Sequence, residues 1–246
     1  MKPYYQDEWV TIYHGDCGEI LPTLDKVDLV LTDPPYGVTR CEWDKDIDLV
    51  LFWELTKQLT GTWIITASQP FTSYMVTSNP ADFSYELIWI KTKASGHLDA
   101  NRKPLKNHES ILFFSTHGYP KYYPQGLVKG EYKTGRNVNM DGKVYGQYSN
   151  HGVSSWGNYP KSAFVISNPS NEGHQHPTQK PIALMEYLTK TYTEEGKTIL
   201  DPFLGSGTTA YCAKKLNRHC IGIEIEEKYC EIAAKRCSQS VMTLNV

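Results

Sequence analysis

Short apolar runs alternate with helix-like stretches at both ends of the chain. Residues 27–32 read as a buried strand, because the run is apolar over a strand's length and Pro34 and Pro35 prevent its continuation as strand or helix. Further strands are predicted at 62–67, 85–91, 110–115, 198–200 and 220–225, and helices at 49–59, 181–192, 208–216 and 227–237. This alternation predicts an α/β fold.

The middle of the chain lacks this pattern. From about residue 116 to 171, Gly, Tyr, Asn, Ser and Pro dominate without a sustained period, over a length too great for an ordinary connection. The segment is therefore either a functional insertion or partly disordered, and its many tyrosines argue against complete disorder. With 246 residues, the chain has the size of one large domain carrying one insertion.

Composition places the chain among ordinary globular enzymes, with 40% hydrophobic and 21% charged residues. No apolar run reaches the roughly 18 residues of a membrane-spanning helix, and the first residues lack the apolar core of a signal peptide. Six cysteines without a Cys-x-x-Cys pair are typical of reduced thiols, which predicts a cytoplasmic protein. His174 and His176 are spaced like metal ligands, but no partner cysteine or carboxylate cluster accompanies them, so we expect no metal site.

Charge is unevenly distributed along the chain. The net charge of −2 argues weakly against a nucleic-acid partner. Residues 91–108 nevertheless contain five basic residues, and the only acidic residue among them is Asp99. The basic residues are Lys91, Lys93, Arg102, Lys103 and Lys106. A second basic stretch spans residues 119–161. Each stretch is either a surface that holds phosphates or a solvated loop face.

The tetrapeptide Asp33-Pro34-Pro35-Tyr36 follows the strand predicted at 27–32. Ligands of open α/β sheets bind at the carboxyl ends of strands. At such an end, Asp33 and the Pro34 carbonyl can accept hydrogen bonds while the Tyr36 ring offers a flat face. This combination suits the amino group of a planar base, and an ordinary proline turn is the alternative.

A second turn, between the strand at 198–200 and the helix at 208–216, is rich in glycine. Gly205, Gly207 and Ala210 match a nucleotide-binding fingerprint, and Glu224 follows about 20 residues later, where an acid binds ribose hydroxyls. A nucleoside-containing cofactor is therefore predicted, with NAD as one candidate. Asp201 favours S-adenosylmethionine instead, because a carboxylate before the turn repels a pyrophosphate and suits an ammonium group. The turn also lies near the C-terminus, without room for a second mononucleotide-binding half.

Five motifs together carry a family resemblance. They are Gly15-Asp16, Asp33-Pro34-Pro35-Tyr36, His176-Pro177-Thr178-Gln179-Lys180-Pro181, Asp201-Pro202-Phe203-Leu204-Gly205-Ser206-Gly207-Thr208-Thr209 and Gly222-Ile223-Glu224. They resemble the β-group of DNA amino-methyltransferases, which form N6-methyladenine or N4-methylcytosine. The order, with the catalytic motif before the cofactor motif, is the circularly permuted order of this group. Residues 37–44 and 68–71 look most like the compact methylases of phages and prophages.

The resemblance implies a mostly parallel, seven-stranded sheet with helices on both faces and one antiparallel strand within a hairpin at the edge. It implies a single catalytic domain over residues 1–246, in which residues 116–172 take the place of the family's target-recognition region. Tyrosines and Trp156 of that region, interleaved with Lys133, Arg136 and Lys143, would stack on bases and hold phosphates.

The resemblance also assigns roles to individual residues. Asp33 and the Pro34 carbonyl would orient the target amino group toward the methyl group, and Tyr36 would stack on a base swung out of the duplex. The residues expected to bind S-adenosylmethionine are Asp16, His176, Thr178, Gln179, Lys180, Asp201, Phe203, Gly205, Ser206, Gly207, Thr208 and Glu224. Those expected to contact DNA are Lys91, Lys93, Arg102, Lys103, Lys133 and Arg136.

These expectations describe an S-adenosylmethionine-dependent enzyme that methylates N6 of adenine in double-stranded DNA. Asp rather than Ser before Pro-Pro-Tyr favours adenine by family habit, with an N4-cytosine enzyme as the alternative. RNA as the substrate stays open, as does an inactive nucleic-acid-binding module of the same fold, although the intact site residues argue against the second. Family members include dimers, so a homodimer is open as well.

Overall fold

The computed structural model describes residues 2–37, 47–133, 153–168 and 179–239. The chain forms two compact units, one made of residues 1–123 with 162–246 and the other of residues 124–161. The first unit carries the Asp-Pro-Pro-Tyr and glycine-rich turns. The second lies within residues 116–172, which are predicted to take the place of a target-recognition region.

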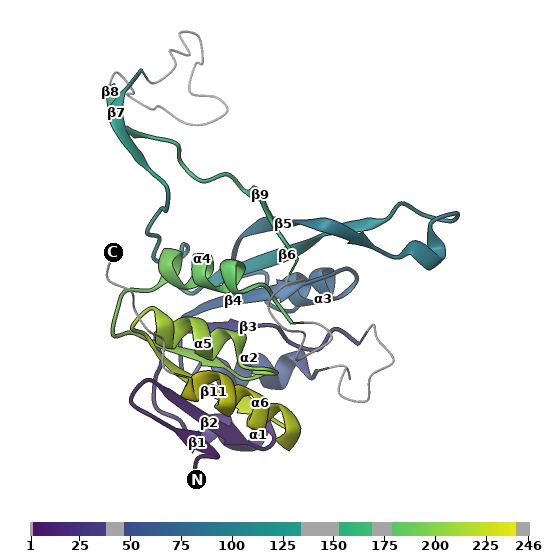
Figure 1. The fold of residues 1–246 in the computed structure, drawn as a ribbon, viewed down its shortest axis with the longest axis vertical. Coiled ribbons are helices and arrows are strands. Elements are labelled where there is room, and N and C mark those ends of the chain that lie inside the picture. Colours follow the sequence, from purple (N-terminus) through teal and green to yellow (C-terminus); the bar gives the residue numbers. More distant parts are fainter. Residues whose placement is uncertain (1, 38–46, 134–152, 169–178, 240–246) are drawn as a thin grey trace. The chain divides into compact units, whose positions relative to one another are not determined.

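A mostly parallel sheet forms the centre of the first unit (Figure 1). In spatial order its strands are β1 (Tyr5–Gln6), β2 (Val10–His14), β11 (His219–Glu224), β10 (Thr198–Asp201), β3 (Leu29–Thr32), β4 (Thr62–Ala67), β6 (Lys106–Ser115), β5 (Phe83–Ser95) and β9 (Ala163–Ile166). The strands from β2 to β4 are mutually parallel, whereas β6 runs antiparallel to both β4 and β5. The predicted α/β fold with a mostly parallel sheet is therefore confirmed.

Over the described residues, this sheet has two strands more than the seven that the resemblance implies. The added strands are β1, which pairs antiparallel with β2, and β9, which pairs parallel with β5 beyond the β5–β6 hairpin. Neither shows in the sequence, because β1 has only two residues and β9 lies in the stretch without a sustained period.

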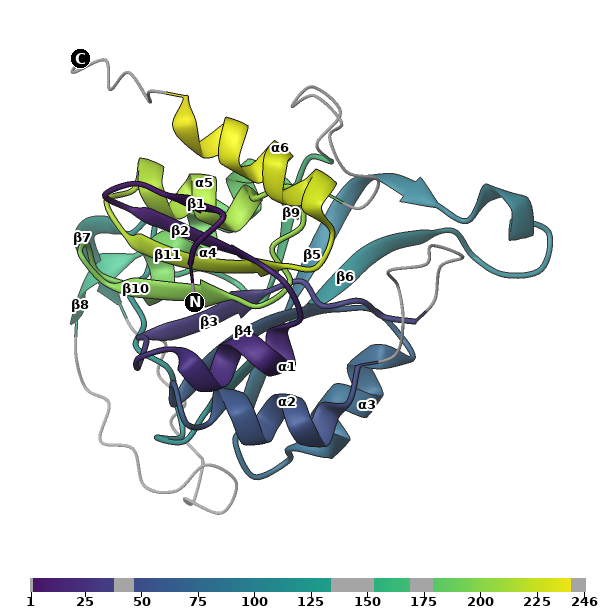
Figure 2. The same ribbon diagram turned by 90° about the horizontal axis from the view of Figure 1, so that it is seen from below.

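Helices cover both faces of the sheet, as Figure 2 shows. One face carries α4 (Ile182–Tyr192), α5 (Thr208–Lys215) and α6 (Glu227–Ser238), and the other α1 (Cys17–Ile20), α2 (Leu49–Thr56) and α3 (Phe71–Ser78). Each face has its own apolar cluster, and β3 contributes to both, with Leu29 and Leu31 in one and Val30 in the other. Burial on both faces explains why β3 reads as an unbroken apolar run.

The predicted elements agree with the structure where the apolar pattern is strong. Strand β4 occupies the predicted residues 62–67, while α2 ends at Thr56 rather than at residue 59. The apolar pattern of the sequence predicts neither β2 nor α3. The sequence of α3, FTSYMVTS, mixes Thr and Ser among its apolar residues and so blurs the helical period.

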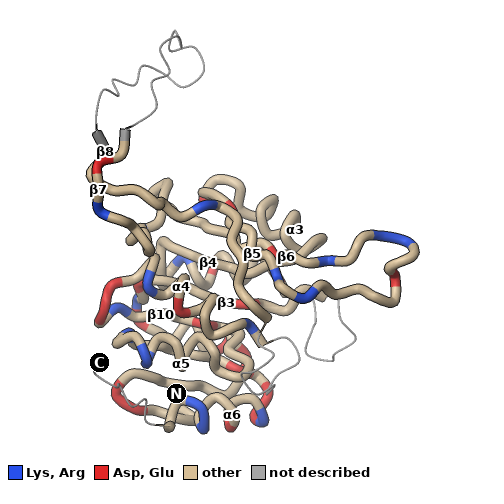
Figure 3. The backbone as a smooth tube through the Cα atoms, turned by 45° about the horizontal axis from the view of Figure 1, so that its top comes forward, with Lys and Arg blue, Asp and Glu red and all other residues tan. Residues whose placement is uncertain are grey.

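Strands β5 and β6 continue beyond the sheet as a two-stranded arm, defined here as residues 91–106 (Figure 1). Pairing extends to Ser95 opposite Lys106, and a short 3-10 helix at His97–Asp99 forms the tip. Figure 3 shows Lys and Arg along the arm. Lys93, Arg102 and Lys103 are exposed there, so the arm presents a basic surface to solvent.

The second unit contains the antiparallel strands β7 (Val128–Lys133) and β8 (Val153–Gly157), in a segment for which the sequence predicts no regular element. Gly157 lies directly under the Tyr132 ring, since a Cβ at Gly157 would lie 2.3 Å from Tyr132 Cε1. Tyr132 and Trp156 are both exposed. Glycines and exposed aromatic residues break the alternation that would reveal these strands in the sequence.

No helix within the described ranges is long and apolar enough to cross a membrane. Over the same part of the chain, no three His, Cys, Asp or Glu side chains come together as metal ligands would. Four of the described cysteines are buried: Cys212, Cys220, Cys230 and Cys237.

Candidate active site

Two sequence motifs meet at one edge of the sheet. Strands β3 and β10 are parallel neighbours, with Leu29 opposite Ile199. Their carboxyl ends therefore lie side by side, with Asp33 just beyond β3 and Asp201 at the end of β10. The Thr32 hydroxyl donates a hydrogen bond of 2.6 Å to Asp201 Oδ1 and so joins the two ends. The Asp-Pro-Pro-Tyr turn and the glycine-rich turn border one site.

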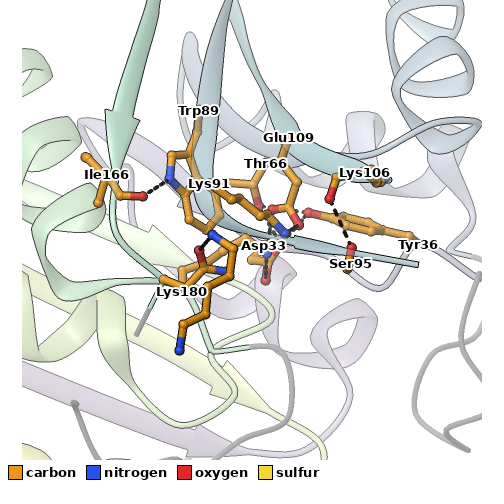
Figure 4. A network of polar contacts seen from close by, with 12 residues as sticks. Asp33, Tyr36, Thr66, Trp89, Lys91, Ser95, Lys106, Glu109, Ile166 and Lys180 are labelled. Carbon is orange, nitrogen blue, oxygen red and sulfur yellow. Dashed lines mark hydrogen bonds and ion pairs between the residues drawn. The ribbon is translucent and has the colours of Figure 1, made fainter. Parts of the chain in front are cut away.

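Asp33 is the centre of a hydrogen-bond network (Figure 4). Its Oδ1 accepts hydrogen bonds from the Tyr36 hydroxyl at 2.6 Å and from the Thr66 hydroxyl on β4. Its Oδ2 accepts one from the Lys180 ammonium at 2.6 Å. Residues from three separate segments thus orient a single carboxylate.

The Tyr36 ring packs against Phe71, with centroids 5.2 Å apart and planes inclined by 26°. Burial and then the Asp33 carboxylate raise the pKa of Tyr36 well above its ordinary value. The hydroxyl therefore stays protonated and donates to Asp33. Stacking of Tyr36 on a target base stays a prediction.

Lys180 and Glu109 extend the network into the protein. Lys180 is 7% exposed, and its Nζ lies 3.5 Å from Oε2 of Glu109 on β6, in addition to its contact with Asp33. Burial disfavours the charge of Lys180, but Asp33 and Glu109 outweigh burial and raise the pKa of Lys180 well above its ordinary value. Burial likewise opposes ionisation of Glu109, and the ammonium groups of Lys180 and Lys91 outweigh it and lower the pKa of Glu109.

The sequence motifs include neither Glu109 nor Thr66. A lone polar residue in or next to a predicted strand carries no signal of a site, because its partners come from other strands. The family resemblance predicts that Lys180 contacts the cofactor. Its ammonium is instead engaged by two carboxylates, and a contact with the cofactor stays a prediction.

Asp201 lies at the base of the glycine-rich turn and is 2% exposed. Its Oδ1 accepts a hydrogen bond from the Phe203 amide at 3.2 Å as well as from Thr32. Burial raises the pKa of Asp201 to about 6. The hydrogen bonds from Thr209 and Thr32 favour the charged form and lower the pKa, but burial has the larger effect. A carboxylate in these surroundings gains from pairing with a cationic ligand.

Glu224 and the glycine-rich turn hold each other in place. Glu224 ends β11, and its Oε2 accepts a hydrogen bond from the Gly205 amide at 2.7 Å. Its Oε1 accepts another from the Glu226 amide at 2.9 Å. Gly207 has a φ of +78°, and a Cβ there would lie 2.7 Å from the Ala233 Cβ. Backbone conformation and the close approach of α6 therefore both require glycine at this position.

Gln179 and Ser206 bring the 176–181 motif to the same turn. Both are buried, and the Ser206 hydroxyl donates to Gln179 Oε1 at 3.3 Å. Gln179 Nε2 is buried without a hydrogen-bond partner among the described residues. Since an unsatisfied buried donor costs roughly 1–3 kcal/mol, an acceptor on a ligand would stabilise this arrangement.

The other predicted cofactor residues take various positions. Phe203 lies near an aromatic ring of α2, with centroids 6.3 Å apart. The Thr208 hydroxyl accepts a hydrogen bond of 2.9 Å from an arginine of α6. Asp16 is exposed and caps α1, where its Oδ1 accepts a hydrogen bond of 2.7 Å from the amide of the helix's second residue. His176 and Thr178 lie outside the described residues.

The predicted DNA contacts fall in different parts of the chain. Three are exposed on the arm: Lys93, Arg102 and Lys103. The Lys91 ammonium is instead drawn into the network beside Glu109. Lys133 ends β7 in the second unit, and Arg136 lies outside the described residues.

Known proteins match this chain over most of its length. The profile of the N6/N4 methyltransferase family, described as DNA methylase, matches residues 27–235. The type II methyltransferase M.ScaI of Streptomyces caespitosus is 28% identical over an alignment of 265 residues, which covers 99% of this chain and 86% of that protein.

Two solved structures are similar to the fold. The crystal structure of the M1.HpyAVI–SAM complex gives a TM-score of 0.68 at 26% identity and covers 94% of this chain and 100% of the other. PvuII DNA methyltransferase, which is cytosine-N4-specific, gives a TM-score of 0.72 at 17% identity and covers 98% of this chain and 91% of its own.

The family match includes the Asp33 turn, the glycine-rich turn and Glu224. It confirms the resemblance to DNA amino-methyltransferases, while the placement near phage enzymes stays a prediction. A dehydrogenase that uses NAD, the alternative for the glycine-rich turn, has no support from this match. The chain belongs to the N6/N4 family of DNA methylases.

Proposed function

We propose that this protein transfers a methyl group from S-adenosylmethionine to N6 of an adenine in a specific DNA sequence. One observation carries the proposal: the turn with Asp33 and the glycine-rich turn with Asp201 lie at the ends of adjacent parallel strands and are linked through Thr32. An acceptor for an amino group thus lies next to a site with the features of a nucleoside site. The family supplies the reaction class, DNA methylation, and S-adenosylmethionine is its cofactor.

The residues at the glycine-rich turn fit S-adenosylmethionine. Asp201 would pair with the ammonium group, and the unpartnered Nε2 of Gln179 would donate to the carboxylate end of the cofactor. Each oxygen of Glu224 accepts one backbone hydrogen bond and keeps a second acceptor site for the ribose hydroxyls. When bound, the cofactor supplies an electrophilic methyl group on a positively charged sulfur.

Asp33 and Pro34 prepare the target nitrogen for attack. An adenine amino group is a poor nucleophile, because its lone pair is delocalised into the ring. Hydrogen bonds from its two hydrogens to Asp33 and to the Pro34 carbonyl localise that lone pair on nitrogen. Because Tyr36 and Thr66 hold the Asp33 carboxylate, negative charge is already placed where positive charge develops on N6.

DNA binding is assigned to two surfaces. The arm, a two-stranded ribbon with exposed basic residues, has the form that enters a major groove or follows a phosphate backbone. We assign target recognition to residues 116–172, supported by the separate second unit and by its exposed aromatic residues Tyr132 and Trp156.

The proposed function is tested by incubating the protein with labelled S-adenosylmethionine and unmethylated genomic DNA, followed by nucleoside analysis by mass spectrometry. N6-methyladenine supports the proposal, and N4-methylcytosine would keep the reaction and replace the base. Absence of transfer by a folded, cofactor-binding protein contradicts the proposal, and the same assay on RNA then separates an RNA enzyme from an inactive binding module.

Replacing Arg102 and Lys103 together with alanine is expected to weaken binding to duplex DNA. If both contact phosphates, the slope of log K against log salt falls by about 2, since each contact contributes about 0.9. Fluorescence anisotropy over a salt series measures this slope. The matched control replaces Lys228 and Lys235, two exposed lysines of α6, and should not change it. An unchanged affinity and slope in the arm variant would exclude these residues from the DNA interface.

Affinity for S-adenosylmethionine is expected to fall as the pH is lowered through about 6. The raised pKa of Asp201 means that the free protein carries a neutral Asp201 below this value and a charged one above it. Because the cofactor's ammonium pairs with the charged form, Kd should rise about tenfold for each pH unit below about 6. Calorimetric titration across this range measures the effect, and Asp201→Asn should bind weakly without that transition. A wild-type Kd that does not vary with pH there contradicts the assignment.

A further inference from the structure

The acceptor sites of Asp33 are largely occupied before any base arrives. Oδ1 accepts hydrogen bonds from Tyr36 and Thr66, and the Lys180 ammonium lies 2.6 Å from Oδ2. A carboxylate oxygen has about two acceptor sites, so both sites of Oδ1 are filled. Oδ2 keeps one acceptor site beside Lys180, so an amino group that donates to Asp33 must share this oxygen with the ammonium.

Glu109 offers Lys180 a second partner. Its Oε1 pairs with the Lys91 ammonium, whereas its Oε2 is buried without a hydrogen bond in the described structure. This oxygen lies 3.5 Å from Lys180 Nζ, an ion-pair distance that is too long for a strong hydrogen bond. A shift on the order of 1 Å would shorten that distance to the roughly 2.7–2.9 Å of a charge-assisted hydrogen bond.

We propose that Lys180 is a positioning residue that moves from Asp33 to Glu109 when the target base enters, and that Glu109 is the acceptor that allows it to leave. The inference rests on the proposed function, because it requires an amino group as the ligand of Asp33. Without the base, Lys180 pairs with the Asp33 carboxylate and orients it. With the base, Asp33 Oδ2 is free to accept an amino hydrogen.

The Lys180 ammonium has a carboxylate partner in both arrangements, while Asp33 keeps the hydrogen bonds from Tyr36 and Thr66. Asp33, Glu109, Lys91 and Lys180 carry two negative and two positive charges in both arrangements. Removing the partner of a buried charge is strongly unfavourable, so a second carboxylate within reach is what makes the movement of Lys180 feasible. Positive charge that develops on the target nitrogen also repels an ammonium bound to the same oxygen, which favours the position at Glu109.

Replacing Glu109 with glutamine, which keeps the shape and removes the charge, tests the proposal. We expect kcat to fall at least about tenfold while the Kd for S-adenosylmethionine stays within about twofold, because Lys180 then remains on Asp33. In a K180M background, the same substitution should change kcat by less than about twofold, since Glu109 acts through Lys180. The control E186Q removes a carboxylate of α4 that pairs with Lys215 at 2.6 Å, and it should leave kcat unchanged.

Full activity of E109Q overturns the proposal. It is also overturned if E109Q lowers kcat by the same factor in the wild-type protein and in K180M. Both outcomes leave the proposed function standing, because the wild-type protein transfers methyl in each. Absence of transfer by the wild type contradicts the proposed function and this inference with it. A crystal structure of the wild-type protein with S-adenosylhomocysteine and target DNA needs no substitution: Lys180 Nζ should lie nearer to Glu109 Oε2 than to Asp33 Oδ2, and the reverse order overturns the proposal.

Discussion

Replacing Asp33 with alanine is expected to abolish methyl transfer while S-adenosylmethionine still binds. The substitution removes the acceptor that orients the target amino group and the negative charge that faces the developing positive charge. Loss of one preorganised electrostatic group commonly lowers kcat by about a hundredfold to a thousandfold, and orientation is lost here as well. Cofactor affinity should persist, because Asp201, Glu224 and the glycine-rich turn keep their own hydrogen bonds.

The Asp33 variant is measured by transfer of labelled methyl to DNA, with calorimetric titration of the cofactor on the same preparation. Removing one partner of a buried ion pair can cost about 3–5 kcal/mol, but Lys180 keeps Glu109 within 3.5 Å, so we expect the variant to fold. Asp25→Ala, at an exposed position before β3, is the control and should behave as the wild type. Undiminished transfer would remove Asp33 from the catalytic site. Loss of cofactor binding in a folded variant would show that Asp33 belongs to the cofactor site.

Replacing Gly207 with alanine is expected to destabilise the protein and to weaken cofactor binding. A left-handed conformation costs an alanine about 1–2 kcal/mol, and at φ +78° this strain is unavoidable. The new Cβ would also lie 2.7 Å from the Ala233 Cβ and 2.9 Å from its Cα, and forced overpacking adds about 1–3 kcal/mol. Movement of α5 away from α6 would shift the glycine-rich turn, because α5 begins at Thr208.

Gly196→Ala separates the two contributions to this loss. Gly196 has a similar φ of +75°, but no atom lies within 4 Å of the Cβ it would gain. Chemical denaturation of both variants should therefore show a loss of about 1–2 kcal/mol for Gly196→Ala and about 2–5 kcal/mol for Gly207→Ala. Equal losses of stability in the two variants would mean that α6 moves to accommodate the new methyl group without cost. An unchanged cofactor Kd in Gly207→Ala would contradict a role of this turn in cofactor binding.

Local patterns in the sequence predict the parts of the fold that depend on near neighbours. Strands β3 and β4 are buried on both faces, so their apolar runs identify them whatever lies beside them. The sequence does not predict β7 and β8, because their glycines and exposed aromatic residues form no alternating pattern. The contact of Tyr132 with Gly157 exists only after the two strands have paired. The edge strand β9 likewise becomes a strand through its pairing with β5.

The two turns of the site are visible in the sequence for the same reason. Prolines end β3 after Asp33, and glycine permits the left-handed conformation at Gly207, so each turn is encoded by its own residues. The class of cofactor follows from this local chemistry, since Asp201 stands directly before a glycine-rich turn. None of these inferences needs the order of the strands.

The pairing of charges around Asp33 was decided by the tertiary structure alone. Asp33 and Lys180 are 147 residues apart in the chain, and Glu109 joins them from β6, two strands away from β3 in the sheet. Periodicity and the conformational limits of proline and glycine act between adjacent residues and leave strand order undetermined. The partner of a buried charge depends on which strands lie side by side, so the residues that hold the carboxylate emerge only once the chain is folded.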